Sequence, residues 1–205
     1  MKKNRSVFMQ AVVAGIVIGI GGTVYLSLEN RVIGAVLFSI GLYAIVLNSL
    51  YLYTGKVGYL AGTKDKKAYG VLLIFTWLGN LVGTVIAAAG ILLTRIAGIR
   101  KTAEEICKVK FADTPVSILI LSIFCGMLMY VAVDGFREKE NPLLLLFCVS
   151  VFILCGFEHC IANMFYFSLA GVWSMKAVGY LLIITFGNSI GGMLIPWIKK
   201  CNEKI

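Results

Sequence analysis

The chain is dominated by long apolar runs that are separated by short polar or charged segments. A helix needs about 20 mostly apolar residues to cross a bilayer, and six stretches approach or exceed that length. They cover approximately residues 7–28, 32–53, 69–93, 116–133, 143–169 and 177–198. The pattern therefore predicts an all-α membrane protein with six transmembrane helices.

Two of these spans contain residues that are unfavourable inside a membrane helix. The second runs into Leu52-Tyr53-Thr54-Gly55-Lys56 before apolar residues resume at Val57. The fifth carries Gly156-Phe157-Glu158-His159 and then Asn163 near its middle. Non-helical backbone at membrane depth is tolerated only where protein buries it or water lines it. We therefore expect the second helix to be broken by a loop at 52–56, and the fifth to be broken near Gly156.

The two halves of the chain share a short motif. Gly79-Asn80-Leu81-Val82-Gly83 in the third span recurs as Gly187-Asn188-Ser189-Ile190-Gly191 in the sixth. With three spans in each half, the second copy enters the membrane from the opposite face. This arrangement predicts a single transmembrane domain, residues 1–205, made of two inverted three-helix repeats at about 7–93 and 116–198. Interrupted helices at corresponding positions of such repeats indicate the transport site.

Composition supports a membrane location. The chain is 60% hydrophobic and 14% charged, with a mean hydropathy of +0.92, whereas soluble domains are about a quarter charged. The net charge is +9, but the basic residues lie at the ends of apolar runs, where they act as topology signals and contact lipid headgroups. We therefore expect membrane lipid rather than nucleic acid as a partner. The excess of Lys and Arg on one side predicts a multi-pass protein of the cell (cytoplasmic) membrane with both termini cytoplasmic, although the segment 95–110, interpreted as a loop on the other side, is also basic.

His159 is the only histidine, and it follows Glu158 within an apolar stretch. An ionisable residue at membrane depth is a functional-site hypothesis by default. Burial and the neighbouring carboxylate act on an imidazole pKa in opposite directions, so the sequence leaves the charge of the ring open. The ring could instead brace the helix break. With one histidine and no CxxC pair among six cysteines, we expect no metal, no cofactor and no disulfide framework.

A known family carries similar motifs. Gly156-Phe157-Glu158-His159-Cys160-Ile161-Ala162-Asn163-Met164-Phe165 resembles the fifth-helix signature of the formate/nitrite transporter family. Leu52-Tyr53-Thr54-Gly55 is similar to the Leu-Phe-Thr loop of that family's broken second helix, and both Gly-Asn-x-x-Gly copies fit its third and sixth helices. The resemblance extends over about residues 14–197. It implies an aquaporin-like fold, a homopentamer with one substrate pore per protomer, and a protein that is not an enzyme.

The resemblance also implies roles for particular residues. The substrate-pore residues would be His159, Thr54, Lys110 and Asn163; the constriction residues Phe38, Leu42, Leu52, Tyr53 and Phe152; and the supporting residues Glu158, Asn80 and Asn188. Leu52 and Tyr53 would form the cytoplasmic constriction, and the other three the outer one. Lys110, or Lys108 across a variable loop, would draw anions into the outer vestibule. We expect Glu158 to hold the broken segment of the second span or a neighbouring subunit, and the asparagines to satisfy freed backbone groups.

The chain departs from the family pattern at four positions. Tyr51 replaces an acidic residue, Tyr53 replaces phenylalanine, Gly126 stands where the family has a pore asparagine, and Lys56 replaces a small polar residue. These departures concern the substrate and the gating rather than the fold.

A transport function follows from these observations. A bare anion in a low-dielectric pore costs several kcal/mol, and a weak acid avoids much of that cost by crossing in its neutral form. We therefore expect a passive channel or proton-coupled transporter for small monovalent inorganic or organic anions, or their conjugate acids, of the formate, nitrite and hydrosulfide class. The alternatives are a non-transporting scaffold or sensor whose pore is closed at Gly126 or Lys56, and an intramembrane enzyme using His159, Glu158 and a cysteine. The enzyme alternative lacks a second histidine and a nucleophile turn.

Overall fold

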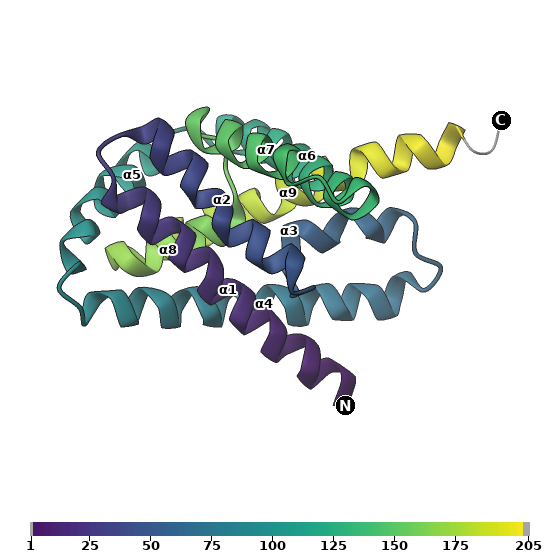
Figure 1. Ribbon diagram of the computed structural model, residues 1–205, viewed down its shortest axis with the longest axis horizontal. Coiled ribbons are helices and arrows are strands. Elements are labelled where there is room, and N and C mark those ends of the chain that lie inside the picture. Colours follow the sequence, from purple (N-terminus) through teal and green to yellow (C-terminus); the bar gives the residue numbers. More distant parts are fainter. Residues whose placement is uncertain (1, 203–205) are drawn as a thin grey trace.

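The structure is a computed structural model that describes residues 2–202, which form helices joined by short turns (Figure 1). Four helices are long and apolar enough to cross a membrane: α1 (Lys2–Ser27), α4 (Lys66–Leu92), α6 (Pro115–Lys139) and α9 (Met175–Asn202). These correspond to the first, third, fourth and sixth apolar stretches of the sequence. The chain is therefore a multi-pass membrane protein, and α1 begins and α9 ends toward the same side of the molecule.

The second and fifth apolar stretches are each divided into shorter helices. The second consists of α2 (Arg31–Leu47), α3 (Tyr53–Lys56) and the 3-10 helix η1 (Val57–Ala61), and the fifth of α7 (Pro142–Leu154) and α8 (Cys160–Ala170). The break in the fifth stretch lies where the sequence predicts it. The loop predicted at 52–56 is wrong in position, because the helix ends at Leu47, the loop covers 48–52, and Tyr53 already begins the next helix.

The segment 95–110, predicted as a loop, also contains helix. A 3-10 turn, η2 (Ala97–Ile99), leads into α5 (Arg100–Ala112). Ala103 and Cys107 are buried on one face of α5, four residues apart, while Lys101 and Lys108 are exposed. Spacing of three to four residues between buried positions is typical of an amphipathic helix. The segment is too highly charged to form an apolar run, so the hydrophobic pattern alone does not indicate this helix.

Both interrupted helices end in the same way. In α2, the Leu50 N–H donates to Ile45 O at 2.9 Å and the Ser49 N–H to Val46 O at 3.1 Å. In α7, 107 residues later, Phe157 N–H donates to Phe152 O at 2.8 Å and Gly156 N–H to Ile153 O at 3.1 Å. Ser49 and Gly156 are left-handed, with φ of 54° and 68°. This is the Schellman arrangement, in which a left-handed residue ends a helix, and only the glycine copy signals it in the sequence.

The two motif asparagines fasten the chain beyond each break. Asn80 Nδ2 donates to Ala11 O and Tyr51 O, and its Oδ1 accepts the Tyr53 N–H. Asn188 Nδ2 donates to Ser122 O and Glu158 O, and its Oδ1 accepts the Cys160 N–H. Both side chains are fully buried. Each asparagine therefore satisfies backbone groups that a broken helix leaves free, as the sequence predicts.

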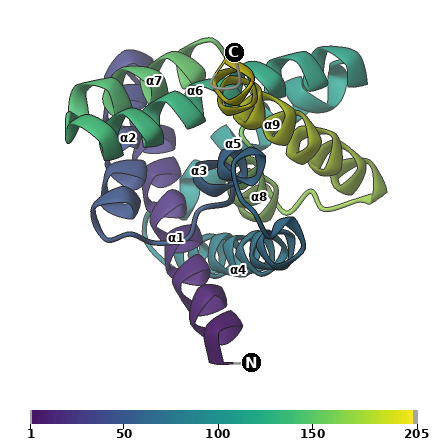
Figure 2. The ribbon, with the colours of Figure 1, turned by 90° about the vertical axis from the view of Figure 1, so that its right-hand side faces the viewer.

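The glycines of the same motif bring long helices together in pairs. A Cβ on Gly83 of α4 would collide with the Val12 carbonyl oxygen of α1, and one on Gly191 of α9 with the Ile123 carbonyl oxygen of α6. Only a residue without a side chain permits this approach of two backbones, a common device in membrane helix packing. The pairs α1–α4 and α6–α9 thus frame the bundle, and α3 and α8 lie between them in its interior (Figure 2).

Candidate functional site

His159 lies at the start of α8 and bonds through both ring nitrogens. Its Nδ1 accepts the Ala162 N–H at 3.1 Å, so that the imidazole caps the helix. Its Nε2 lies 2.8 Å from Thr54 Oγ1 in α3. Because Nδ1 acts as an acceptor, a neutral ring carries its proton on Nε2 and donates it to the threonine. His159 and Thr54 are 2% and 1% exposed, so the pair joins the two broken spans inside the protein.

Glu158 is paired within its own protomer. Its Oε2 accepts from Lys110 Nζ of α5 at 2.6 Å and from Asn163 Nδ2 of α8 at 2.8 Å. Asn163 Nδ2 also donates to His159 O at 3.0 Å. The sequence predicts that Glu158 contacts the broken segment of the second span, but within this chain its carboxylate contacts α5 and α8. A buried carboxylate is stabilised by a paired cation, which Lys110 supplies. Lys110, expected to attract anions, has its charge compensated by this pair.

The other face of Asn163 is unpaired. Its Oδ1 is buried and has no hydrogen-bond partner among residues 2–202. Buried polar atoms are nearly always bonded, and an exception needs an explanation. Asn163 lies on the wall of a cavity, but its Oδ1 is itself buried, so a donor reaches this acceptor only if the wall around it opens.

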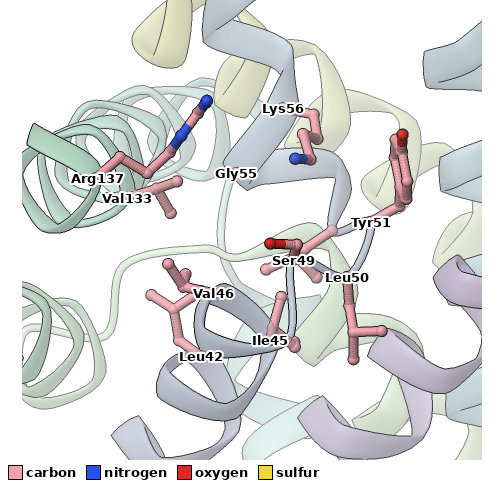
Figure 3. Close-up of a pocket in the computed structure, with 11 residues that line it drawn as sticks. Leu42, Ile45, Val46, Ser49, Leu50, Tyr51, Gly55, Lys56, Val133 and Arg137 are labelled. Atoms are coloured by element: carbon pink, nitrogen blue, oxygen red, sulfur yellow. The ribbon is translucent and has the colours of Figure 1, made fainter.

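Two cavities approach the interior from opposite ends of α2. The first, of about 320 Å³, is called the His159 cavity; its wall includes Tyr25, Arg31, Ile106, Lys110, Phe152, Gly156, Phe157, Glu158, His159 and Asn163. The second, of about 290 Å³, is called the Lys56 cavity; it is lined by Leu42, Ile45, Val46, Ser49, Leu50, Tyr51, Leu52, Gly55, Lys56, Val133 and Arg137 (Figure 3). Arg31 begins α2 and Ser49 follows its end, which places the cavities on opposite sides of the bundle.

An aromatic layer separates these cavities. No residue of 2–202 lines both of them. Phe152 stacks on the His159 ring with centroids 5.5 Å apart and planes at 24°. Phe38 meets Phe152 edge to face at 6.0 Å. Phe38, Phe152 and His159 are all buried, so they form a closed layer in the protein interior beside the Thr54–His159 bond.

Comparison with known proteins identifies the family. Residues 1–199 match the formate/nitrite transporter family. The chain belongs to the formate/nitrite transporter family. It is 28% identical to the nitrite transporter NirC of Salmonella typhimurium over 216 residues, which cover 91% of this chain and 79% of that protein. It is 30% identical to a probable formate transporter of Methanothermobacter thermautotrophicus, with 82% of this chain and 73% of that protein covered.

Solved structures show the same fold. A pentameric formate channel with formate bound superposes with a TM-score of 0.85 at 23% identity, covering 99% of this chain and 98% of that one. An ion channel of the formate/nitrite transporter family superposes with a TM-score of 0.83 at 22% identity, covering 97% and 90%. The relatives named are transporters and channels rather than enzymes.

The structure of this family member distributes the predicted constriction residues unevenly. Phe152 lines the His159 cavity, whereas Leu42, assigned with it to the outer constriction, lines the Lys56 cavity together with Leu52. The Tyr53 hydroxyl donates to Ser189 Oγ of α9 at 2.8 Å, because that serine donates onward to Thr185 O. The hydroxyl that the sequence adds to the Leu-Phe-Thr motif therefore binds a neighbouring helix.

Three further placements bear on the transporter site. Of the two candidate lysines, Lys110 lines the His159 cavity, while Lys108 is exposed and lines neither cavity. Gly126 lies against the Asn188 backbone, so it belongs to the contact between α6 and α9. Among residues 2–202, no three His, Cys, Asp or Glu side chains gather closely enough to hold a metal ion.

Sequence reasoning missed two cations of the site. Arg31 lines the His159 cavity and Arg137 lines the Lys56 cavity, yet the sequence interprets both only as topology signals. Each lies at a helix end, far along the chain from the motifs that mark the broken spans. Only the folded arrangement assigns them to a cavity.

Proposed function

We propose that this chain conducts small monovalent anions of the formate, nitrite and hydrosulfide class across the cytoplasmic membrane, and that they pass its centre as neutral conjugate acids. The observation that carries this proposal is the buried Thr54–His159 hydrogen bond of 2.8 Å, which joins the two broken spans beside the His159 cavity. The naming of relatives for nitrite and formate transport supports the substrate class.

The central layer favours the neutral form of the permeant. Phe38 and Phe152 offer a carboxylate no hydrogen bond, and placing a bare charge there costs several kcal/mol. A protonated acid has a donor hydroxyl and an acceptor oxygen. Asn163 Oδ1, which has no partner among the described residues, accepts the first when the wall around it opens, and the Thr54 hydroxyl, which accepts the His159 Nε2–H, is free to donate to the second.

One cation of the His159 cavity suits the approach of an anion. Lys110 and Glu158 form a neutral pair. Arg31 lines the cavity and forms no ion pair among the described residues, and Asp113, on the same wall, accepts hydrogen bonds from Thr114 N–H and Ser117 Oγ. A fixed cation raises the local concentration of anions. We infer that Arg31, rather than the paired Lys110, draws the anion in, and that Glu158 and Asn163, on the same cavity wall, lie beside the position at which it is protonated.

The same proposal includes the assembly. The four long helices, together with α2–α3–η1 and α7–α8 as two broken spans, make six spans in a single domain, residues 1–205. Equivalent contacts of Asn80 and Asn188, and equivalent ends of α2 and α7, support two inverted repeats. The likeness to a pentameric formate channel supports a homopentamer, and the excess of basic residues supports cytoplasmic termini.

Transport is tested in proteoliposomes with stopped-flow light scattering. Sodium formate, nitrite and hydrosulfide are each applied as an osmotic step, with protein-free liposomes as the control. The proposal predicts rapid shrinkage followed by reswelling at substrate-dependent rates. Shrinkage without reswelling beyond the protein-free control, for all three anions, would favour the scaffold or sensor alternative.

A further inference from the structure

The walls of the two cavities are built from corresponding residues of the two broken spans. Eight wall positions of the Lys56 cavity are 45, 46, 49–52, 55 and 56. Adding 107 to each gives 152, 153, 156–159, 162 and 163, and all eight line the His159 cavity. One backbone frame, with one kind of helix ending, therefore forms a cavity at each mouth.

The side chains on this shared frame differ in their chemistry. Glu158 corresponds to Tyr51, His159 to Leu52, and Asn163 to Lys56. The Lys56 cavity thus lacks the carboxylate and the imidazole of its counterpart and gains an ammonium group. Tyr51 and Lys56 are also two of the positions at which the chain departs from the family pattern.

A second cation completes the Lys56 cavity. Arg137, near the end of α6, lines the same cavity as Lys56 of α3, and Figure 3 shows the two side chains coming from these two elements. Lys56 Nζ lies 5.0 Å from the centre of the Tyr51 ring, and Arg137 Cζ lies 4.9 Å from that of the Tyr59 ring. Aromatic faces hold the two cations in place without neutralising them.

No carboxylate compensates these charges. Within the described chain, 2–202, neither Lys56 nor Arg137 forms an ion pair. Asp134, one turn before Arg137, is occupied by the Tyr59 hydroxyl at 3.1 Å and by Lys199 Nζ at 3.5 Å. The contrast with the Lys110–Glu158 pair at the other mouth is direct: that pair is neutral, whereas the Lys56 cavity carries two uncompensated positive charges.

We propose that Lys56 and Arg137 form a second anion site, which binds a small oxyanion in its charged form at the mouth opposite the His159 cavity. A guanidinium presents two parallel N–H groups that match two oxygens of a carboxylate, nitrite or sulfate, and an ammonium adds a point charge. Hydrosulfide, with a single acceptor atom, cannot form the two parallel bonds. The identity of the anion at this site rests on the proposed function, whereas the site itself does not. Contacts with Lys56 and Arg137 replace part of the water around the oxyanion before it enters the pore.

Sulfate, a dianion outside the proposed substrate class, is used to test this site as a blocker of formate flux. Formate flux is measured in proteoliposomes with sodium sulfate inside, outside or on both sides, against sodium chloride of equal ionic strength. The orientation of the protein is read from labelling of the exposed Cys201 by an impermeant maleimide in a Cys155→Ser background. Sulfate on the Lys56 side is expected to inhibit the wild type, and sulfate on the His159 side to leave it unaffected.

Three variants and a matched control locate the effect. Lys56→Gln and Arg137→Gln each remove a charge-assisted contact and are expected to raise the half-inhibiting sulfate concentration about tenfold. Arg137→Lys keeps the charge but loses the fork, and is expected to raise it about threefold. Lys67→Gln removes an exposed charge at the start of α4, outside both cavity walls, and should behave as the wild type.

Thermal unfolding of the purified protein measures sulfate binding at the same site independently of transport. Sulfate should raise the unfolding midpoint of the wild type and of Lys67→Gln more than that of the Lys56→Gln/Arg137→Gln double variant. Equal shifts in all proteins, or inhibition that is equal from both sides, would overturn the site. A wild type that conducts no formate but shows the differential shift would refute the proposed function and retain the site.

Discussion

Replacing His159 by phenylalanine is expected to abolish formate flux and to destabilise the protein, whereas His159→Asn should remove most of the flux and keep the fold. The reason is that the ring has two separate contacts, to Ala162 N–H and to Thr54 Oγ1. Asparagine is a good N-cap and can still accept from the start of α8, but its short side chain does not reach Thr54. Phenylalanine satisfies neither.

The magnitudes follow from these contacts. A buried N–H left without a partner costs roughly 1–3 kcal/mol, which is the expected loss of stability in His159→Phe. A comparable loss for the permeant in His159→Asn lowers the flux about tenfold or more, since about 1.4 kcal/mol changes a rate tenfold. Thr54→Ser, which keeps the hydroxyl, is the control for Thr54→Val, which removes it. Undiminished flux in both His159 variants, by stopped-flow light scattering, would remove the ring from the mechanism.

Lys110→Met is expected to lower the free energy of unfolding by about 3–5 kcal/mol, because it leaves a buried carboxylate without its cation. The Lys110 and Glu158 side chains are 13% and 4% exposed, with the charged atoms 2.6 Å apart. In the double variant Lys110→Met/Glu158→Gln no charge remains, and most of the loss should be recovered. Denaturant unfolding of the detergent-solubilised protein measures all three free energies.

Lys108→Met is the matched control, since Lys108 lies on the same helix but is exposed. It should change stability by less than about 0.5 kcal/mol. Additive losses in the double variant, or a Lys110→Met protein as stable as Lys108→Met, would show that the pair does not form. Lys110 would then be free to attract anions, as the family resemblance alone implies.

The sequence predicted the long helices and one helix break, because each depends on residues that are neighbours along the chain. The four long helices follow from apolar runs, and the break in the fifth span follows from Gly156, which adopts a positive φ. The break in the second span was misplaced because Leu50-Tyr51-Leu52 continues the apolar run and the left-handed residue is Ser49 rather than glycine. The α5 helix was missed because its charged residues outnumber its buried residues, Ala103 and Cys107.

Contacts between distant segments were predicted only where a motif repeated. The bridging roles of Asn80 and Asn188 were expected, because both lie in the same Gly-Asn-x-x-Gly pattern. The pairing of Lys110 with Glu158, 48 residues apart, and the meeting of Lys56 with Arg137 in one cavity leave no periodic signal. Electrostatic partners are chosen by the folded geometry, and a single sequence does not encode them in its spacing.

Formate uptake and internal pH, recorded together in proteoliposomes under an imposed membrane potential, test most directly whether the permeant crosses the Phe152–His159 layer without charge. Protein-free liposomes and His159→Phe supply the background. The account predicts that each formate taken up acidifies the interior by one proton and that the rate is the same for either sign of the potential. Uptake that follows the potential, with no acidification, would show that the anion itself crosses and would contradict the account.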